Sequence, residues 1–318
     1  MTAGVETSTD IVINLNGHKL SMANGNLSSA IRHTNGHLVV DGTKKGSVIE
    51  ATNSEKNTQC INVRGGSLTV NGGTYIAIAG AEKEARTIQI YPGLKATLTD
   101  CDIFAYAADK SFVGGVFNYG TATLTNCRAA AYADYNTDIR NYSHGIYNEG
   151  PMTLNNCYAY GTHSAVNSRD TLVVNGGTYE SPGHGGFYVC SPDKTAYIHN
   201  ATIRFCEMKE GYIYTKGAFG PGMYIGSGSN MTVYMDNCKI YSKAGTPQIA
   251  LTDSYGGNDN TLYISNSELY DLGGAAPYVR IDNDTIKLYL GTGNNFTAAN
   301  TKRPSSVIET GETYDSIP

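Results

Sequence analysis

Three histidines, one arginine and one glutamate are the residues of this sequence best suited to proton-transfer chemistry. His144, His163 and His184 each come just before a short alternating apolar segment, and Glu149 and Arg169 follow two of these segments. A histidine can act as a general base near neutral pH, and an arginine can neutralise a carboxylate on a bound molecule. Glu149, Arg169, His163 and His184 are therefore the catalytic candidates. The alternative is that the histidines, of which His144 is one residue out of step, are solvated turn residues.

A sequence repeat must position these residues. The segments GVFNYGTATLTNC (115–127) and GIYNEGPMTLNNC (145–157) match nearly position for position. An apolar residue two positions before Asn, Asp or Gly recurs along the chain, at Leu15, Val40, Val70, Leu98, Leu124, Leu154, Val174, Ile198, Met235, Ile264 and Leu290. Short strands at this spacing, without helical periodicity, predict a solenoid of about eleven turns that bury their apolar faces against each other.

Two further columns of the repeat indicate backbone and core positions. The first contains residues that tolerate positive φ, namely Gly17, Gly42, Gly72, Asp100, Asn126, Asn156, Gly176, Asn200, Asn237 and Asn266. We therefore expect every turn to bend there through a left-handed residue. The next column contains small residues, including Cys101, Cys127, Cys157 and Cys238. We expect these cysteines to be small core residues rather than disulfides or metal ligands.

A second strand precedes the ladder strand in each turn and carries the binding candidates. Its apolar residues, such as Ile88, Ile146 and Val166, are predicted to point inward, and alternation places the intervening residues outside. The outward set includes Tyr91, Phe117, Tyr119, Tyr147, Asn167, Tyr188 and Tyr224. Rings stack on the apolar faces of sugars and amides hydrogen-bond hydroxyls, so these residues predict a glycan-binding face. The alternative is that Tyr simply favours strands and half-buried surfaces.

The segments GIYNEGPMTLNNC, GSLTVNGGTY and IVINLNGHKLS resemble those of right-handed parallel β-helix proteins of the pectate-lyase-like superfamily. The resemblance covers roughly residues 10 to 295 and implies an all-β, right-handed parallel β-helix. Members include polysaccharide lyases and hydrolases, bacterial surface proteins and phage tailspikes, and the outer face of this sheet carries substrate in that family. Two polygalacturonase motifs have counterparts at Asn136–Thr137–Asp138 and Gly183–His184–Gly185. The paired aspartates of those enzymes are missing, so hydrolysis lacks its acid and base.

The resemblance and the repeat together divide the chain. Residues 1–10 are expected to form a short lead-in, and residues 11–295 a single β-helix domain with an inserted loop at 206–222. Residues 296–318 lose the repeat and are expected to form a C-terminal cap or tail. No apolar run is long enough to cross a membrane as a helix, and no signal peptide is visible.

Composition narrows the class of partner. The net charge of −5 disfavours nucleic acid, and no motif predicts a metal or a cofactor. We expect an extracellular, cell-surface or virion-borne protein that binds a polysaccharide or cell-surface glycan and does not insert into a membrane. A homo-trimer or larger assembly is compatible with this expectation. A structural fibre or capsid module is the alternative. A polysaccharide lyase or glycoside hydrolase ranks third, because the catalytic carboxylate pair is missing.

Overall fold

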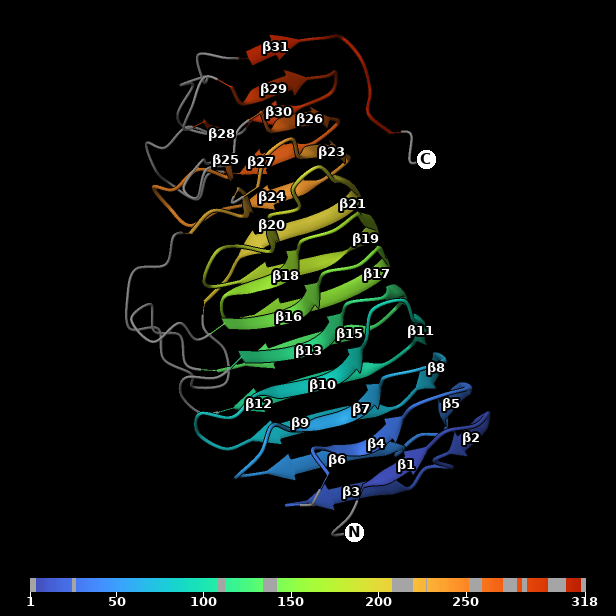
Figure 1. The fold of residues 1–318 in the computed structure, drawn as a ribbon. Coiled ribbons are helices and arrows are strands. Elements are labelled where there is room, and N and C mark those ends of the chain that lie inside the picture. The colour runs from blue at the N-terminus through green and yellow to red at the C-terminus, as the bar shows by residue number, and fades with distance from the viewer. Residues whose placement is uncertain are drawn as a thin grey trace.

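The protein is a rod of stacked turns (Figure 1). The computed structural model describes residues 4–24, 27–107, 112–133, 142–207, 220–226, 228–251, 259–270, 279–281, 285–296 and 307–315. Every secondary-structure element assigned within these ranges is a β-strand. None of the described residues forms a helix long and apolar enough to cross a membrane.

Eleven parallel strands form the front sheet, which faces the viewer in Figure 1. Each turn of the chain adds one strand to this sheet, and neighbouring strands come from consecutive turns. The strands are β1 (Val5–Thr7), β4 (Ser29–His33), β7 (Gln59–Val63), β10 (Ala85–Ile90), β13 (Phe112–Asn118), β16 (Tyr142–Asn148), β18 (Ser164–Ser168), β20 (Phe187–Val189), β22 (Met223–Ile225), β25 (Ile249–Leu251) and β28 (Val279–Ile281).

The remaining strands form a second, 20-stranded sheet. This sheet bends sharply in the middle of each turn of the chain. Strands before the bend are β2 (Ile11–Asn14), β5 (His37–Gly42), β8 (Ser67–Gly72), β11 (Lys95–Thr99), β14 (Thr121–Thr125), β23 (Thr232–Asp236), β26 (Thr261–Ser265), β29 (Lys287–Leu290) and β31 (Val307–Glu309). Strands after it are β3 (Lys19–Ala23), β6 (Val48–Asn53), β9 (Thr74–Ala79), β12 (Asp102–Ala107), β15 (Arg128–Tyr132), β24 (Lys239–Tyr241), β27 (Glu268–Tyr270) and β30 (Asn295–Phe296). Three strands continue through the bend, β17 (Met152–Gly161), β19 (Leu172–Ser181) and β21 (Thr195–Phe205). The predicted right-handed parallel β-helix is confirmed.

The apolar ladder forms the core as predicted, except in the first turn. From Val40 to Leu290 the ladder residues are Cα partners in consecutive strands, and all are at most 5% exposed. In the first turn Ile13, not Leu15, pairs with Val40. The error is two residues, which alternation cannot detect because a shift of two keeps the same side chains inside.

The bends follow the predicted left-handed column with one exception. Asp100, Asn126 and Asn156 have φ of 55°, 52° and 51°, and the column stays left-handed to Asn266 at 48°. Asn156 donates to Asn126, which donates to Asp100, each over 3.1 Å. Gly42 is not left-handed, because its turn is longer and places the positive φ (91°) at Gly46 instead.

The cysteines of the small column lie in the core. Cys101, Cys127, Cys157 and Cys238 are at most 2% exposed and are free thiols. Their Sγ atoms lie against backbone carbonyls, as Cys157 Sγ does at 3.5 Å from the oxygen of Leu124. Burial raises the pKa of Cys157 to about 12, so this thiol stays protonated in the folded protein.

Both ends of the chain add strands to the rod. Within the expected lead-in, β1 pairs with β4. In the expected C-terminal cap, β31 pairs with β29, and the Tyr314 ring packs edge-on against Tyr263 at 5.1 Å between centroids. Most of the expected inserted loop, residues 208–219, lies outside the described residues.

Candidate functional site

The predicted site residues lie on the outer face of the front sheet, in two parallel columns. Phe117, Tyr147, Asn167, Tyr188 and Tyr224 are Cα partners in successive strands and form one column. The second column lies two residues further along each turn and contains Tyr91, Tyr119, Glu149 and Arg169, each of which donates its backbone N–H to the turn before. The sequence alternation therefore placed both columns correctly.

The first column is less exposed than an open aromatic face would be. Phe117 is fully buried, Asn167 is 3% exposed, and Tyr147 and Tyr224 are 6% and 7% exposed. The expectation that all these rings are free to contact a ligand is wrong for Phe117, because an outward position can still be covered by neighbouring side chains. The accessible surface belongs to the second column, where the side chains of Glu149 and Arg169 are 35% and 50% exposed.

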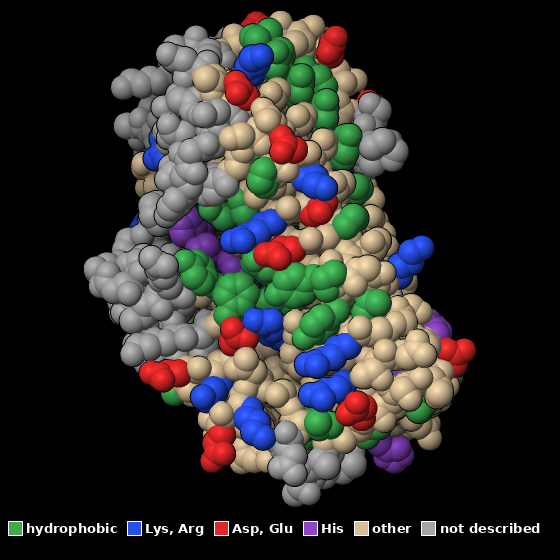
Figure 2. All heavy atoms as spheres, viewed as in Figure 1, with side chains coloured by type: hydrophobic (Ala, Val, Ile, Leu, Met, Phe, Trp, Pro, Cys, Tyr) green, Lys and Arg blue, Asp and Glu red, His purple; other side chains and the backbone are tan. Residues whose placement is uncertain are grey.

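Aromatic rings cover the first column. Phe112, at the start of β13, lies 5.1 Å from the Tyr147 ring and 5.2 Å from the Phe117 ring. The Phe117 ring folds back over Gly114, where an added Cβ would lie 2.4 Å from its Cε2 atom. Phe112 and Tyr142 were not predicted, although they are register partners and begin the similar segments FVGGVF and YSHGIY. Figure 2 shows hydrophobic side chains gathered halfway along this face, with histidines beside them.

The three histidines form one row of rings across consecutive turns. The ring centroids of His144 and His163 are 5.0 Å apart, and those of His163 and His184 are 4.2 Å apart. His144 is buried and His163 is 6% exposed, so the expectation of solvated turn residues is wrong. Burial lowers the pKa of His144 to about 3 and that of His184 to about 4, and it lowers the pKa of His163 well below its usual value. All three rings are therefore neutral at pH 7.

Polar contacts fix the orientation of His144. Its Nδ1 atom lies 2.8 Å from Ser164 Oγ, and its Nε2 atom lies 3.4 Å from Asn167 Nδ2. An amide Nδ2 can only donate, so Nε2 of the neutral ring accepts from Asn167 and the ring proton lies on Nδ1, which donates to Ser164. Asn167, which belongs to the first column, is thus hydrogen-bonded to the histidine row.

Tyr147 connects the histidine row to Glu149 and Arg169. Its ring lies 5.6 Å from the His144 ring, and its hydroxyl donates to Glu149 Oε1. Arg169 Nη1 lies 3.5 Å from the same carboxylate oxygen, and the guanidinium carbon lies 5.5 Å from the Tyr147 ring centroid. Burial and the hydrogen bond to Glu149 raise the pKa of Tyr147, so its hydroxyl remains protonated. The four predicted catalytic candidates are thus joined through Tyr147 and His144, neither of which was among them.

Arginines extend the site toward the N-terminal half of the rod. Arg86 lies over the Phe117 ring at 4.9 Å and pairs with Glu84 at 2.7 Å. Arg64 lies over the Tyr91 ring at 5.4 Å. The rings of this face are therefore held by cations as well as by one another.

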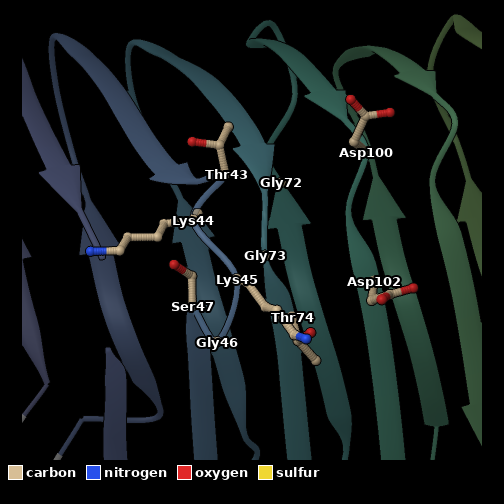
Figure 3. A pocket seen from close by; sticks show the side chains of 11 residues that line it. Thr43, Lys44, Lys45, Gly46, Ser47, Gly72, Gly73, Thr74, Asp100 and Asp102 are labelled. Carbon is tan, nitrogen blue, oxygen red and sulfur yellow. The ribbon is translucent and has the colours of Figure 1, made fainter. Parts of the chain in front are cut away.

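A polar hollow of about 310 Å³ lies elsewhere, at the bend between the two parts of the second sheet (Figure 3). Its lining comes from three consecutive turns and includes Lys44, Lys45, Thr74, Asp100 and Asp102. Glycines 42, 46, 72 and 73 are also part of its lining. It shares no residue with the histidine row. Within the described ranges, no three His, Cys, Asp or Glu residues are grouped so as to hold a metal ion.

Comparison with solved structures finds a similar backbone. The A-module of the mannuronan C-5 epimerase AlgE6 from Azotobacter vinelandii matches 99% of this chain and 91% of its own with a TM-score of 0.52, at 13% sequence identity. No protein-family model and no curated protein matches the chain. At this identity the likeness establishes the parallel β-helix fold.

Proposed function

We propose that this protein binds a polysaccharide along the outer face of the front sheet. The observation that carries the proposal is the partly exposed column in which Tyr91, Tyr119, Glu149 and Arg169 follow one another on consecutive turns. Consecutive turns are about 4.8 Å apart, so a linear polymer lying along the rod meets an aromatic or charged group at each step. Aromatic rings contact the apolar faces of sugars, and the charged groups hydrogen-bond hydroxyls or carboxylates.

The buried groups beneath this column support the same face. Tyr147 and His144 lie within a packed aromatic cluster, so Glu149 and Arg169 start from a rigid base. A rigid site loses less side-chain entropy on binding than a mobile one. The structurally similar epimerase acts on mannuronan, a polysaccharide, which supports a polymer of the same class. We place the protein outside the cell or on a virion, where such polymers are met.

Binding can be tested on a panel of immobilised neutral and acidic polysaccharides. The variants Tyr119→Ala and Arg169→Ala remove a partly exposed ring and an exposed charge from the column, and each should weaken binding at least tenfold. Tyr270→Ala is the matched control, because Tyr270 stacks on Tyr241 at 4.5 Å on another face of the rod. The proposal fails if no polymer binds, or if the control variant weakens binding as much as the two site variants.

A second candidate function is chemical modification of an acidic polysaccharide. It is favoured by the contact of Tyr147 with Glu149 and Arg169 next to three neutral histidines. Arg169 can neutralise a uronate carboxylate, which acidifies the C–H bond beside it, and a neutral imidazole or a tyrosine can take part in the proton transfer. The buried imidazoles are weak bases and Tyr147 keeps its proton, so the Glu149 carboxylate is the group that can accept the proton from carbon and the Tyr147 hydroxyl the group that can donate one.

Proton abstraction has two distinguishable outcomes. Elimination leaves an unsaturated product that absorbs in the ultraviolet, whereas epimerisation in D2O introduces deuterium at the reacting carbon, which proton NMR detects. Tyr147→Phe removes the hydroxyl but keeps the ring, and should abolish either signal while polymer binding persists. Binding without any absorbance change or deuterium uptake on acidic polymers would leave the first function and eliminate the second.

A further inference from the structure

One outward column of the second sheet carries no charge over the whole length of the rod. It runs from Val12 on β2 to Ile308 on β31 through twelve strands in unbroken register. Among these strands, β2, β5, β8, β11, β17, β19 and β21 lie along the right-hand edge of the rod in Figure 1. None of the twelve positions holds Asp, Glu, Lys or Arg. By contrast, the outward columns of the front sheet contain Arg32, Glu149 and Arg169.

The column also has an exposed apolar side chain at each end. Among the described residues, the exposed large hydrophobic side chains are Val12 at 66%, Ile308 at 45% and Tyr142 at 37%. Two of these three are the opposite ends of this one column. A continuous uncharged stripe with exposed apolar side chains at both ends is unusual on a surface that faces only water, so it indicates a protein partner.

The column changes in size from one half to the other. Its first seven positions are Val or Thr, and the next four are tyrosines, from Tyr197 to Tyr289. The tyrosine rings stack on each other with centroids 4.6 to 5.3 Å apart, so their faces are occupied and only their edges point outward. Tyr314 contacts this stack from the flank, through Tyr234 and Tyr263, and leaves all four rings partly exposed. A ring whose faces are covered by other rings cannot stack on a sugar. This column is therefore less suited to glycan binding than the candidate site.

We propose that this column is the interface of an antiparallel dimer, in which the second sheet of one copy faces that of another. A two-fold axis across the rod brings position n of one copy against position 13 − n of the other. Each bulky tyrosine then faces a small Val or Thr, as Tyr234 faces Thr97, and the two exposed ends, Val12 and Ile308, cover each other. Parallel pairing would set tyrosine on tyrosine and leave a gap along the valine and threonine half.

Charge and area agree with this arrangement. The flanking charges Lys95 and Lys287 on one side and Asp41 on the other oppose no like charge when the rods overlap fully, and Asp236 is buried. A stripe of twelve strands and three columns measures about 50 Å by about 14 Å. The C-terminal segment covers the third column on three of these strands, where His199, Asp236 and Ser265 are at most 7% exposed. The free area is therefore about 600 Å² per copy, at the lower end of the range for stable protein interfaces.

A charge swap tests both the surface and the orientation. Sedimentation equilibrium of the full chain should give twice the 34.0 kDa chain mass. Thr97→Glu and Tyr234→Lys should each raise the dimer dissociation constant at least tenfold, because each buries an unpaired charge. Combining them should restore the dimer, since the two positions lie far apart in one copy but face each other across the antiparallel interface. Thr202→Glu, an outward threonine beyond the bend of β21, is the control and should leave the mass unchanged.

The outcomes separate clearly once circular dichroism shows that each variant is folded. A wild-type chain that stays monomeric up to about 100 μM overturns the proposal, because interfaces of this size associate well below that concentration. A dimer that survives both single variants overturns it as well. A folded double variant that remains monomeric overturns the antiparallel arrangement. Polysaccharide binding by the front sheet is unaffected by any of these results.

Discussion

The buried histidine row makes this protein sensitive to mild acid, and His144 provides the sharpest test. The folded protein keeps His144 neutral down to a pKa of about 3, whereas an unfolded chain binds a proton there below about pH 6.5. The unfolded state therefore binds more protons in this window, and stability falls as the pH falls. Between pH 7.5 and pH 5 the loss is about 2 kcal/mol for each histidine that stays neutral when folded. His184, whose pKa burial lowers to about 4, adds a loss of similar size.

The measurement is the free energy of unfolding from urea titrations at several pH values between 7.5 and 5. In His144→Gln the pH-dependent loss should shrink by about 2 kcal/mol, whatever the substitution does to the stability at pH 7.5. Gln keeps a group able to hydrogen-bond Ser164 but cannot titrate. His18→Gln, at an exposed position, is the control and should leave the slope unchanged. An unaltered slope in His144→Gln would refute the conclusion that this ring is buried and neutral.

Three further changes test the packing that supports the site. Gly114→Ala should push the Phe117 ring off its strand, because the added Cβ would lie 2.4 Å from the ring; we expect a loss of about 1–3 kcal/mol in thermal or urea unfolding, and weaker polysaccharide binding. Leu154→Ala empties a fully buried ladder position and should cost about 2–5 kcal/mol in the same unfolding assay. Asn156→Ala should lower the free energy of unfolding by about 1–2 kcal/mol, because it loses the hydrogen bond to Asn126 and places alanine at a left-handed φ of 51°. Asn156→Gly should cost less, because glycine tolerates this φ.

The candidate site divides into a surface and a support. Glu149 and Arg169 are the groups a polymer can reach, while His144 and Phe112 pack against Tyr147 beneath them. Substitutions of the first kind should change binding with little effect on stability, and substitutions of the second kind should change both. Measuring unfolding and binding on the same variants therefore distinguishes direct contact from support.

The front sheet also illustrates how much of a solenoid site is visible in its sequence. Alternation assigned inward and outward positions correctly, and the repeat placed Tyr119, Glu149 and Arg169 on consecutive turns. The histidine row could not be predicted in the same way, since His144 lies within β16 while His163 precedes β18. Their rings meet because side chains can tilt along the rod axis. The position of a residue within its repeat does not predict that tilt.

The amino-acid sequence by itself determined the parallel β-helix, the apolar ladder from Val40 to Leu290 and the left-handed bends at Asp100, Asn126 and Asn156, because these depend on a local period and on residue types that tolerate positive φ. Only the tertiary structure decided which outward side chains stay exposed. It buried Phe117 under neighbouring rings and shifted the first turn by two residues. The physical reason is that exposure depends on contacts between turns some 20 to 37 residues apart, and a strand's own alternation carries no information about what its neighbours place above it.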